Sequence, residues 1–115
     1  DNDLGYHDLE QAFRHVKGDF PQILLAHSPD IVMDLKKYDL SPDLVVTGHT
    51  HCGQVRLPFY GAFPMTIPTS FGRKLDKHFY TVDDQALFIT CGVGEVGPRG
   101  RFFNPPEIVI LNINQ

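Results

Sequence analysis

The sequence predicts an α/β fold in which parallel strands are covered by helices. Two compact apolar runs, QILLAH at 22–27 and DLVVTG at 43–48, are separated by a short helical pattern, which is the size and order of a βαβ unit. Both runs are continuously rather than alternately apolar, as is typical of strands that are buried on both faces. We therefore expect two neighbouring parallel strands whose carboxyl ends open on one edge of the sheet.

Length and composition fit a single domain with one modest core. The chain has 115 residues, 42% of them hydrophobic, and a net charge of -4, which argues against a nucleic-acid partner held by a basic surface. No apolar run approaches the ~20 residues that span a bilayer, and no signal-peptide pattern opens the chain. Cys52 and Cys91 could pair, but two cysteines are too few to indicate a disulfide framework, so reduced thiols are expected.

The first predicted element is a helix. Asp8 is placed to cap its first turn, Gln11 stands in the capping-box position, and Gly18 is a natural end. Its apolar stripe at i, i+3, i+4 and i+7 consists of Leu9, Ala12, Phe13 and Val16.

The βαβ unit follows. The strand at 22–27 is stopped by Ser28-Pro29, and a short helix is expected over residues 30–37 before the strand at 43–48. The side chains that should face inward from this helix are Ile31, Val32 and Leu35.

The second half of the chain is less regular. Residues 53–76 are rich in glycine and proline and predict a long irregular connection, with a short strand at 54–57. HFYTV (78–82) and ALFITCGVG (86–94) predict a hairpin. A glycine- and arginine-rich loop follows, and EIVILNI (107–113) predicts a closing strand.

Three histidines share one predicted location. His27 ends the first strand of the βαβ unit, and His49 and His51 follow the second. A lone histidine at a strand end is more often structural, but three at one sheet edge favour a metal site, since neutral imidazole is a common ligand. In an extended stretch the side chains of His49 and His51 would project to the same side. Cys52 would then point away, as a small buried thiol rather than a ligand.

Polar residues near these histidines are candidates for substrate binding. Gln54 and Arg56 follow the histidines directly, and Arg101 lies in the later loop; guanidinium groups match the paired oxygens of phosphate-like anions. The glycines of GVGEVG resemble a phosphate-cradling loop only weakly, because the strand–turn–helix context is missing.

Three sequence stretches resemble the C-terminal half of a calcineurin-like metallophosphoesterase of the bacterial YkuE/YaeI-type phosphodiesterase branch. They are LLAHSPDI, LVVTGHTHCGQVRLP and GVGEVGPRGRFFNPPEIVIL. The resemblance implies an αββα sandwich (the metallo-dependent phosphatase fold) with two divalent ions, Mn, Zn or Fe, at its edge. It implies that His27 and His49 bind one ion and His51 the other.

The family pattern is incomplete in this sequence. A D-x-H element, a G-D element whose Asp bridges the ions, and G-N-H-D, which supplies an Asn ligand and the catalytic His, are not found at the expected places. Residues 1–115 are therefore expected to form the C-terminal part of a single metallophosphoesterase domain, without its N-terminal metal-binding half. No catalytic residue is expected in this chain, and three neutral histidines should hold two dications poorly.

The expected function is metal-dependent hydrolysis of a phosphodiester or phosphomonoester by an activated water, with the isolated chain inactive. The alternative is a non-catalytic module that binds a metal or an anion and pairs with another chain. The expected partners are a small-molecule or lipid-linked phosphoester and either the N-terminal half of the domain or another copy of the chain. The location, cytoplasmic or associated with the cell envelope, is left open.

Overall fold

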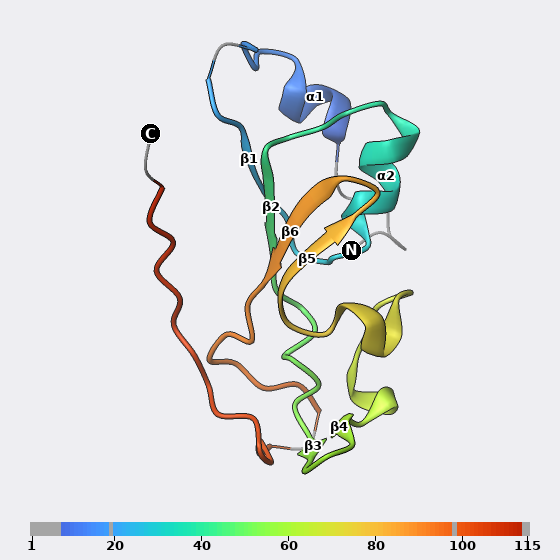
Figure 1. Ribbon diagram of the computed structural model, residues 1–115, viewed down its shortest axis with the longest axis vertical. Coiled ribbons are helices and arrows are strands. Elements are labelled where there is room, and N and C mark those ends of the chain that lie inside the picture. The colour runs from blue at the N-terminus through green and yellow to red at the C-terminus, as the bar shows by residue number, and fades with distance from the viewer. Residues whose placement is uncertain (1–7, 19, 98, 114–115) are drawn as a thin grey trace.

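The computed structural model describes residues 8–18, 20–97 and 99–113 and contains a four-stranded mixed sheet (Figure 1). The strand order is β1-β2-β6-β5, in which β1, β2 and β6 are parallel and β5 is antiparallel to β6. The strands are β1 (Ile23–Leu25), β2 (Leu44–Thr47), β5 (His78–Val82) and β6 (Gln85–Ile89). The predicted α/β class is confirmed.

The predicted βαβ unit is present. Helix α2 (Ile31–Lys37) connects β1 to β2 and buries Ile31, Val32 and Leu35, as its periodicity predicts. Beyond the last strand pair, the Gly48 N–H donates to the His27 carbonyl oxygen at 3.1 Å. This hydrogen bond holds the carboxyl ends of β1 and β2 together at one edge of the sheet.

Helix α1 (Leu9–Phe13) is shorter than the apolar stripe predicts. The Asp8 side chain caps it as expected, accepting from the Gln11 N–H at 2.8 Å. The helix ends before Val16, which is exposed. Only Leu9 of α1 is buried, so the residues after Phe13 gain little packing energy from staying helical.

The core lies on one face of the sheet. It is formed by Leu9, Ile31, Val32, Leu35, Val45, Leu75, Leu87 and Ile89. On the opposite face, Leu25 is 76% exposed and Phe79 is 65% exposed. The expectation of a sheet covered on both faces is therefore met only in part by the described residues: Phe88 of the central strand β6 is buried on this second face, whereas Leu25 and Phe79 of the edge strands β1 and β5 are exposed.

The strand predicted at 107–113 is not formed. These residues run in an extended conformation on the side of the sheet away from α2 (Figure 1), without strand pairing. Ile108 is 86% exposed, and the Glu107 N–H donates to the Gly92 carbonyl oxygen at 3.1 Å. The apolar pattern predicted a strand, but no neighbouring strand in the described part of the chain pairs with it.

The connection at 53–76 is more ordered than predicted. It contains the hairpin of β3 (Arg56–Leu57) and β4 (Gly61–Ala62), which confirms the short strand expected at 54–57. Two 3-10 helices follow, at Pro64–Thr66 and Gly72–Leu75. Within the described residues, no helix has the length and apolar character needed to cross a membrane.

Candidate metal centre

His27 and His49 lie side by side at the edge of the sheet. His27 follows β1 and His49 follows β2, and their ring centroids are 4.3 Å apart with the planes tilted by 47°. The parallel pairing of β1 and β2 is what brings the two rings together, since both strands end at this edge. The structure thus places two imidazoles within reach of one ion.

His51 reaches the same site through a turn rather than an extended strand. His49, His51 and Cys52 all have positive φ angles, of 64°, 46° and 54°. The expected extended geometry at 49–51 is therefore wrong, although His49 and His51 still line one pocket. Left-handed backbone at non-glycine residues costs energy and is concentrated at functional sites.

Thr50 holds this strained turn in place. Its side chain is fully buried, and its hydroxyl donates to the Asp76 carbonyl oxygen at 2.7 Å. The same Oγ1 atom accepts from the Cys52 N–H at 3.0 Å. The first bond ties the backbone between His49 and His51 to a segment 26 residues further along the chain, and the second closes the turn locally.

The electrostatic setting of His49 favours the form that binds metals. Burial lowers the pKa of His49, and nearby His27 and His51 lower it further. A lowered pKa keeps this imidazole neutral near pH 7, and only the neutral ring has a lone pair to donate. The chemistry of the donor set therefore fits a divalent ion.

The described residues do not place all three imidazoles around a single point. In the described part of the chain, the residues whose possible ligand atoms all lie within 4.8 Å of one another are Cys52, Cys91 and Glu107. The three histidines do not form such a group. The His27–His49 pair and His51 are better suited to two neighbouring positions, each of which needs further ligands.

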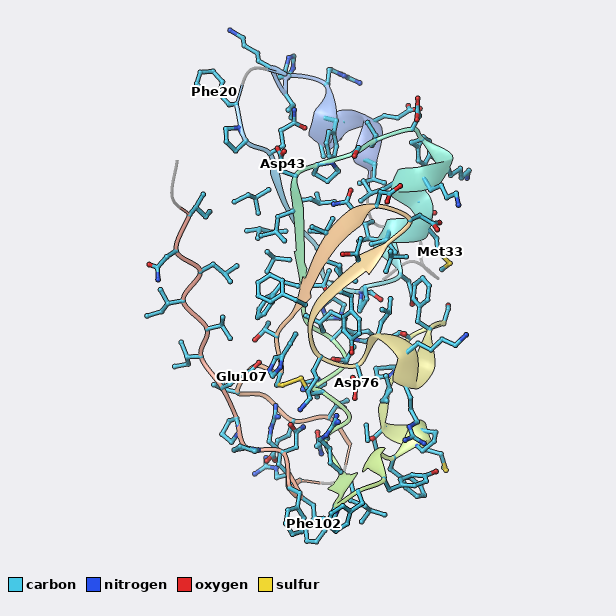
Figure 2. The ribbon with its side chains drawn as sticks, in the orientation of Figure 1. Phe20, Met33, Asp43, Asp76, Phe102 and Glu107 are labelled. Carbon is cyan, nitrogen blue, oxygen red and sulfur yellow. A yellow bond between two sulfur atoms is a disulfide. The ribbon has the colours of Figure 1, made fainter. Side chains whose placement is uncertain are left out.

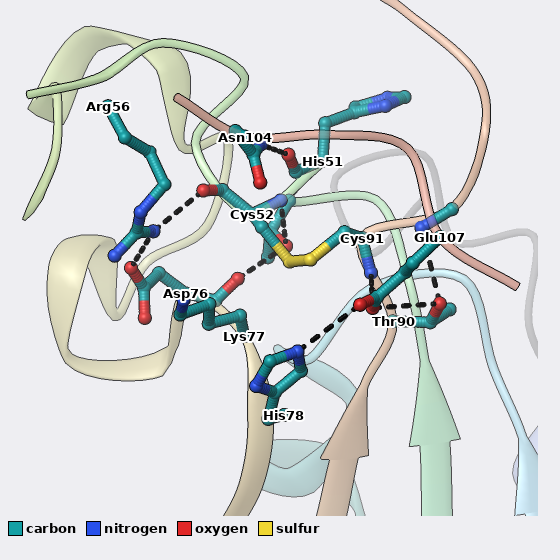
Figure 3. Close-up of a disulfide and its surroundings, with 12 residues drawn as sticks. His51, Cys52, Arg56, Asp76, Lys77, His78, Thr90, Cys91, Asn104 and Glu107 are labelled. Carbon is teal, nitrogen blue, oxygen red and sulfur yellow. Dashed lines mark hydrogen bonds and ion pairs between the residues drawn. A yellow bond between two sulfur atoms is a disulfide. The ribbon is translucent and has the colours of Figure 1, made fainter. Parts of the chain in front are cut away.

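Cys52 and Cys91 form a disulfide, which is the yellow bond in Figure 2 and is drawn in close-up in Figure 3. The bond joins the turn after β2 to the loop after β6, and both cysteines are buried. The expectation of reduced thiols is therefore wrong, and neither sulfur is available as a thiolate ligand. The pairing of two cysteines 39 residues apart could not be predicted from their spacing, because it depends on β2 lying beside β6.

Gln54 and Arg56, the first two predicted substrate-binding residues, make contacts that hold loops together. Arg56 Nη1 donates to an Asp76 carboxylate oxygen at 2.6 Å and to the Cys52 carbonyl oxygen at 2.8 Å. The Gln54 side chain donates to the Val96 carbonyl oxygen and accepts from the Val96 N–H. Substrate contacts by these residues remain predictions.

Arg101, the third predicted substrate-binding residue, contacts backbone carbonyl groups of the preceding loop. Its Nη2 donates to the carbonyl oxygens of Cys91 (2.8 Å), Gly92 (3.1 Å) and Gly94 (2.6 Å). Its Nε and Nη1 atoms are buried and make no hydrogen bond to the described residues. The guanidinium thus organises the loop after β6.

Two residues that sequence reasoning did not assign also support the site (Figure 3). The Asn104 side chain donates to the His51 carbonyl oxygen at 2.7 Å, and Glu107 accepts from the Cys91 N–H at 2.7 Å. Burial raises the pKa of Glu107, but hydrogen bonds from Cys91 and His78 outweigh it and leave the pKa below its usual value. Both residues belong to the RFFNPPE stretch, whose polar residues were the available sequence signal.

A pocket of about 510 Å³ opens beside His49 and His51. Its wall is partly polar, from Gln54, Thr66 and Arg99, and partly apolar, from Val55, Met65, Pro68 and Val96. The pocket therefore combines potential metal ligands, a cation and an apolar surface.

Comparison with known proteins identifies relatives that match most of this chain. The chain is 33% identical over 110 residues to metallophosphoesterase YkuE of Bacillus subtilis, matching 96% of this chain and 37% of the relative. It is 38% identical over 93 residues to metallophosphoesterase Cj0846 of Campylobacter jejuni, matching 79% of this chain and 22% of the relative. The chain belongs to the metallophosphoesterase superfamily.

A relative with a more specific name is the UDP-2,3-diacylglucosamine pyrophosphatase LpxG of Chlamydia muridarum. It is 33% identical over 110 residues, which cover 90% of this chain and 32% of LpxG. The chain thus spans 22% to 37% of the length of these three relatives. No family model and no solved structure matches it.

Proposed function

We propose that this chain is the C-terminal part of a phosphoester hydrolase that uses two divalent ions and an activated water. The observation that carries the proposal is the pairing of His27 and His49 at the sheet edge, with His51 on the same pocket, in a chain of this superfamily. The complete domain would be the αββα sandwich of the calcineurin-like enzymes.

The three histidines would supply imidazole ligands to neighbouring ions. His27 and His49 would serve one ion, and His51 the other. When bound, Mn, Zn or Fe ions would polarise the phosphoryl group and lower the pKa of the attacking water. The protein's part is to keep the rings neutral and fixed, which the low pKa of His49 and the Thr50 anchor support.

The remaining ligands and the catalytic histidine are assigned to the N-terminal half of the domain. Neutral imidazoles do not compensate the charge of two dications, and carboxylates are needed to do so. The isolated chain should therefore bind metal weakly and lack activity. The uncovered sheet face with Leu25 and Phe79 offers an apolar surface for the missing half.

The pocket beside the histidines favours a substrate with an apolar group attached to its phosphate. Val55, Met65 and Val96 form the apolar wall, and Arg99 contributes a positive charge at the same pocket. A lipid-linked phosphoester combines these two properties. LpxG, whose name specifies a diacylated nucleotide sugar, is consistent with this class.

Removal of metal is expected to abolish phosphodiesterase activity of the complete protein. Chelation followed by dialysis should eliminate p-nitrophenol release from bis-p-nitrophenyl phosphate, and added Mn²⁺ should restore it, because the activated water requires the ions. Metal content is measured in parallel by mass spectrometry. Full activity in protein shown to be free of metal would contradict the proposal.

The substrate class is tested by introducing a charge on the apolar wall. Val96→Asp is expected to lower kcat/KM for p-nitrophenyl dodecyl phosphate by about tenfold, since part of the alkyl chain loses its apolar contact. Activity on bis-p-nitrophenyl phosphate should change by less than about twofold. Val93→Asp, an exposed valine of the same loop outside this pocket, is the matched control. Equal losses on both substrates would contradict the lipid-linked class.

The alternative is a non-catalytic module that binds one metal ion and pairs with another chain. The open apolar sheet face and the histidine pair are the observations that favour it. Calorimetric titration of the isolated chain with zinc separates the two functions. Tight binding of one ion per chain would favour the module, and negligible binding would favour the C-terminal part of a hydrolase.

A further inference from the structure

We propose that Arg101 is a positioning residue for His51, acting through the carbonyl group of Gly94 and not by contact with substrate. This inference rests on the proposed function, in which His51 is a metal ligand. It assigns Arg101 the task of selecting which ring nitrogen of His51 faces the ion.

The contact between His51 and Gly94 defines the tautomer. His51 Nδ1 lies 3.2 Å from the Gly94 carbonyl oxygen. A carbonyl oxygen only accepts hydrogen bonds, so Nδ1 carries the proton and Nε2 keeps the lone pair that binds a metal. A backbone carbonyl that fixes a ligand histidine in this way contributes to metal affinity without touching the ion.

Arg101 holds the carbonyl that makes this contact. Its Nη2 donates to the Gly94 oxygen at 2.6 Å and also to the oxygens of Cys91 and Gly92. Three carbonyl oxygens that turn toward one point repel each other, and a cationic donor at that point offsets the repulsion. Among the described residues, no group other than Arg101 and the His51 ring is hydrogen-bonded to the Gly94 carbonyl oxygen, whereas Cys91 and Gly92 are also held by Glu107.

The other side of the contact is anchored separately. The Asn104 side chain binds the His51 carbonyl oxygen at 2.7 Å, and the next residue, Cys52, is bonded to Cys91. Because the backbone of His51 is fixed by these two links, loss of Arg101 should free the Gly94 carbonyl and the ring, not the whole turn.

The burial of Arg101 argues against a direct role with substrate. Its Nε and Nη1 atoms are buried, and Nη2 is occupied by backbone. Arg99, in contrast, lines the pocket. The two arginines thus have different expected roles, although both belong to one loop.

The first test measures the His51 tautomer in the metal-free complete protein by long-range ¹H–¹⁵N NMR. Wild-type protein should show a proton on Nδ1. Arg101→Met, which keeps the side-chain volume but has no donor, should shift His51 toward the Nε2–H form that a free histidine side chain favours in water. An unchanged Nδ1–H tautomer in folded Arg101→Met would overturn the proposal.

The second test measures manganese affinity by calorimetry. Arg101→Met should lower the affinity for one of the two ions by about 10-fold to 100-fold and change the affinity for the other by less than about twofold. Arg73→Ala is the matched control, because Arg73 is exposed and also donates to a backbone carbonyl, that of Tyr60, outside the site. A purely structural role would instead weaken both ions together and lower thermal stability.

Arg101→Lys decides the matter if Arg101→Met does not fold. An ammonium group cannot reproduce the planar guanidinium's contacts, so the affinity for one ion should still fall more than the affinity for the other. Equal losses at both ions, or no loss at either, would overturn the proposal. The NMR result is independent of catalysis. Metal-dependent hydrolysis with an unchanged tautomer and unchanged affinities would refute the positioning role alone, whereas a shifted tautomer in a protein without hydrolase activity would refute the proposed function alone.

Discussion

His49→Ala in the complete protein is expected to lower kcat/KM for bis-p-nitrophenyl phosphate by more than about 100-fold, since loss of even an outer-shell partner of a metal ligand costs 10-fold to 100-fold. His49 is the central ring of the site: it contacts His27 and shares a pocket with His51. In the proposed assignment its removal takes away one metal ligand, and the lowered pKa of His49 keeps this imidazole in the neutral form that binds metal. The measurement is steady-state hydrolysis at saturating Mn²⁺, with metal content determined on the same samples.

His15→Ala provides the matched control for this experiment. His15 is exposed near the end of α1, away from the sheet edge, and its replacement should leave both kcat/KM and metal content unchanged. Near-wild-type hydrolysis by His49→Ala would remove His49 from the mechanism. Reduced activity at full metal content would assign it to substrate contact instead of metal binding.

Gly53→Ala is expected to destabilise the complete protein by about 3 kcal/mol, the combined cost of a left-handed non-glycine residue and an overpacked contact. Gly53 has a φ of 61° and is buried against β4. An added methyl group would overlap the Ala62 methyl and lie 3.2 Å from Ile67 Cγ1. The 49–52 turn adjoins this contact, so metal affinity should fall as well. Urea unfolding measures the stability change.

Gly72→Ala separates the two contributions. Gly72 also has a positive φ, of 53°, but an added methyl group would meet no atom within 4 Å. Its replacement should cost only about 1–2 kcal/mol, from the backbone conformation alone. Equal destabilisation by the two substitutions would show that the close approach of Gly53 to Ala62 is not what requires glycine there.

Local patterns predicted the elements that position the histidine pair. The apolar run at 22–27 and the periodicity at 30–37 indicated β1 and α2 because side-chain burial repeats at a fixed interval in each. The same reasoning failed at 107–113, where an apolar run predicts a strand but pairing requires a neighbour. It also failed at Leu25, because continuous hydrophobicity does not tell an edge strand from a central one.

The sequence by itself determined the class of the fold, the superfamily motifs and the placement of His27 and His49 at the ends of two strands. Only the tertiary structure decided the disulfide between Cys52 and Cys91, the left-handed turn through His51, and the contacts of Arg101 and Asn104. The physical reason is the separation along the sequence between the residues that interact. Strands and helices are specified by neighbours a few residues apart, whereas the hydrogen bonds around the candidate metal centre join segments up to 53 residues apart that meet only once the sheet has formed.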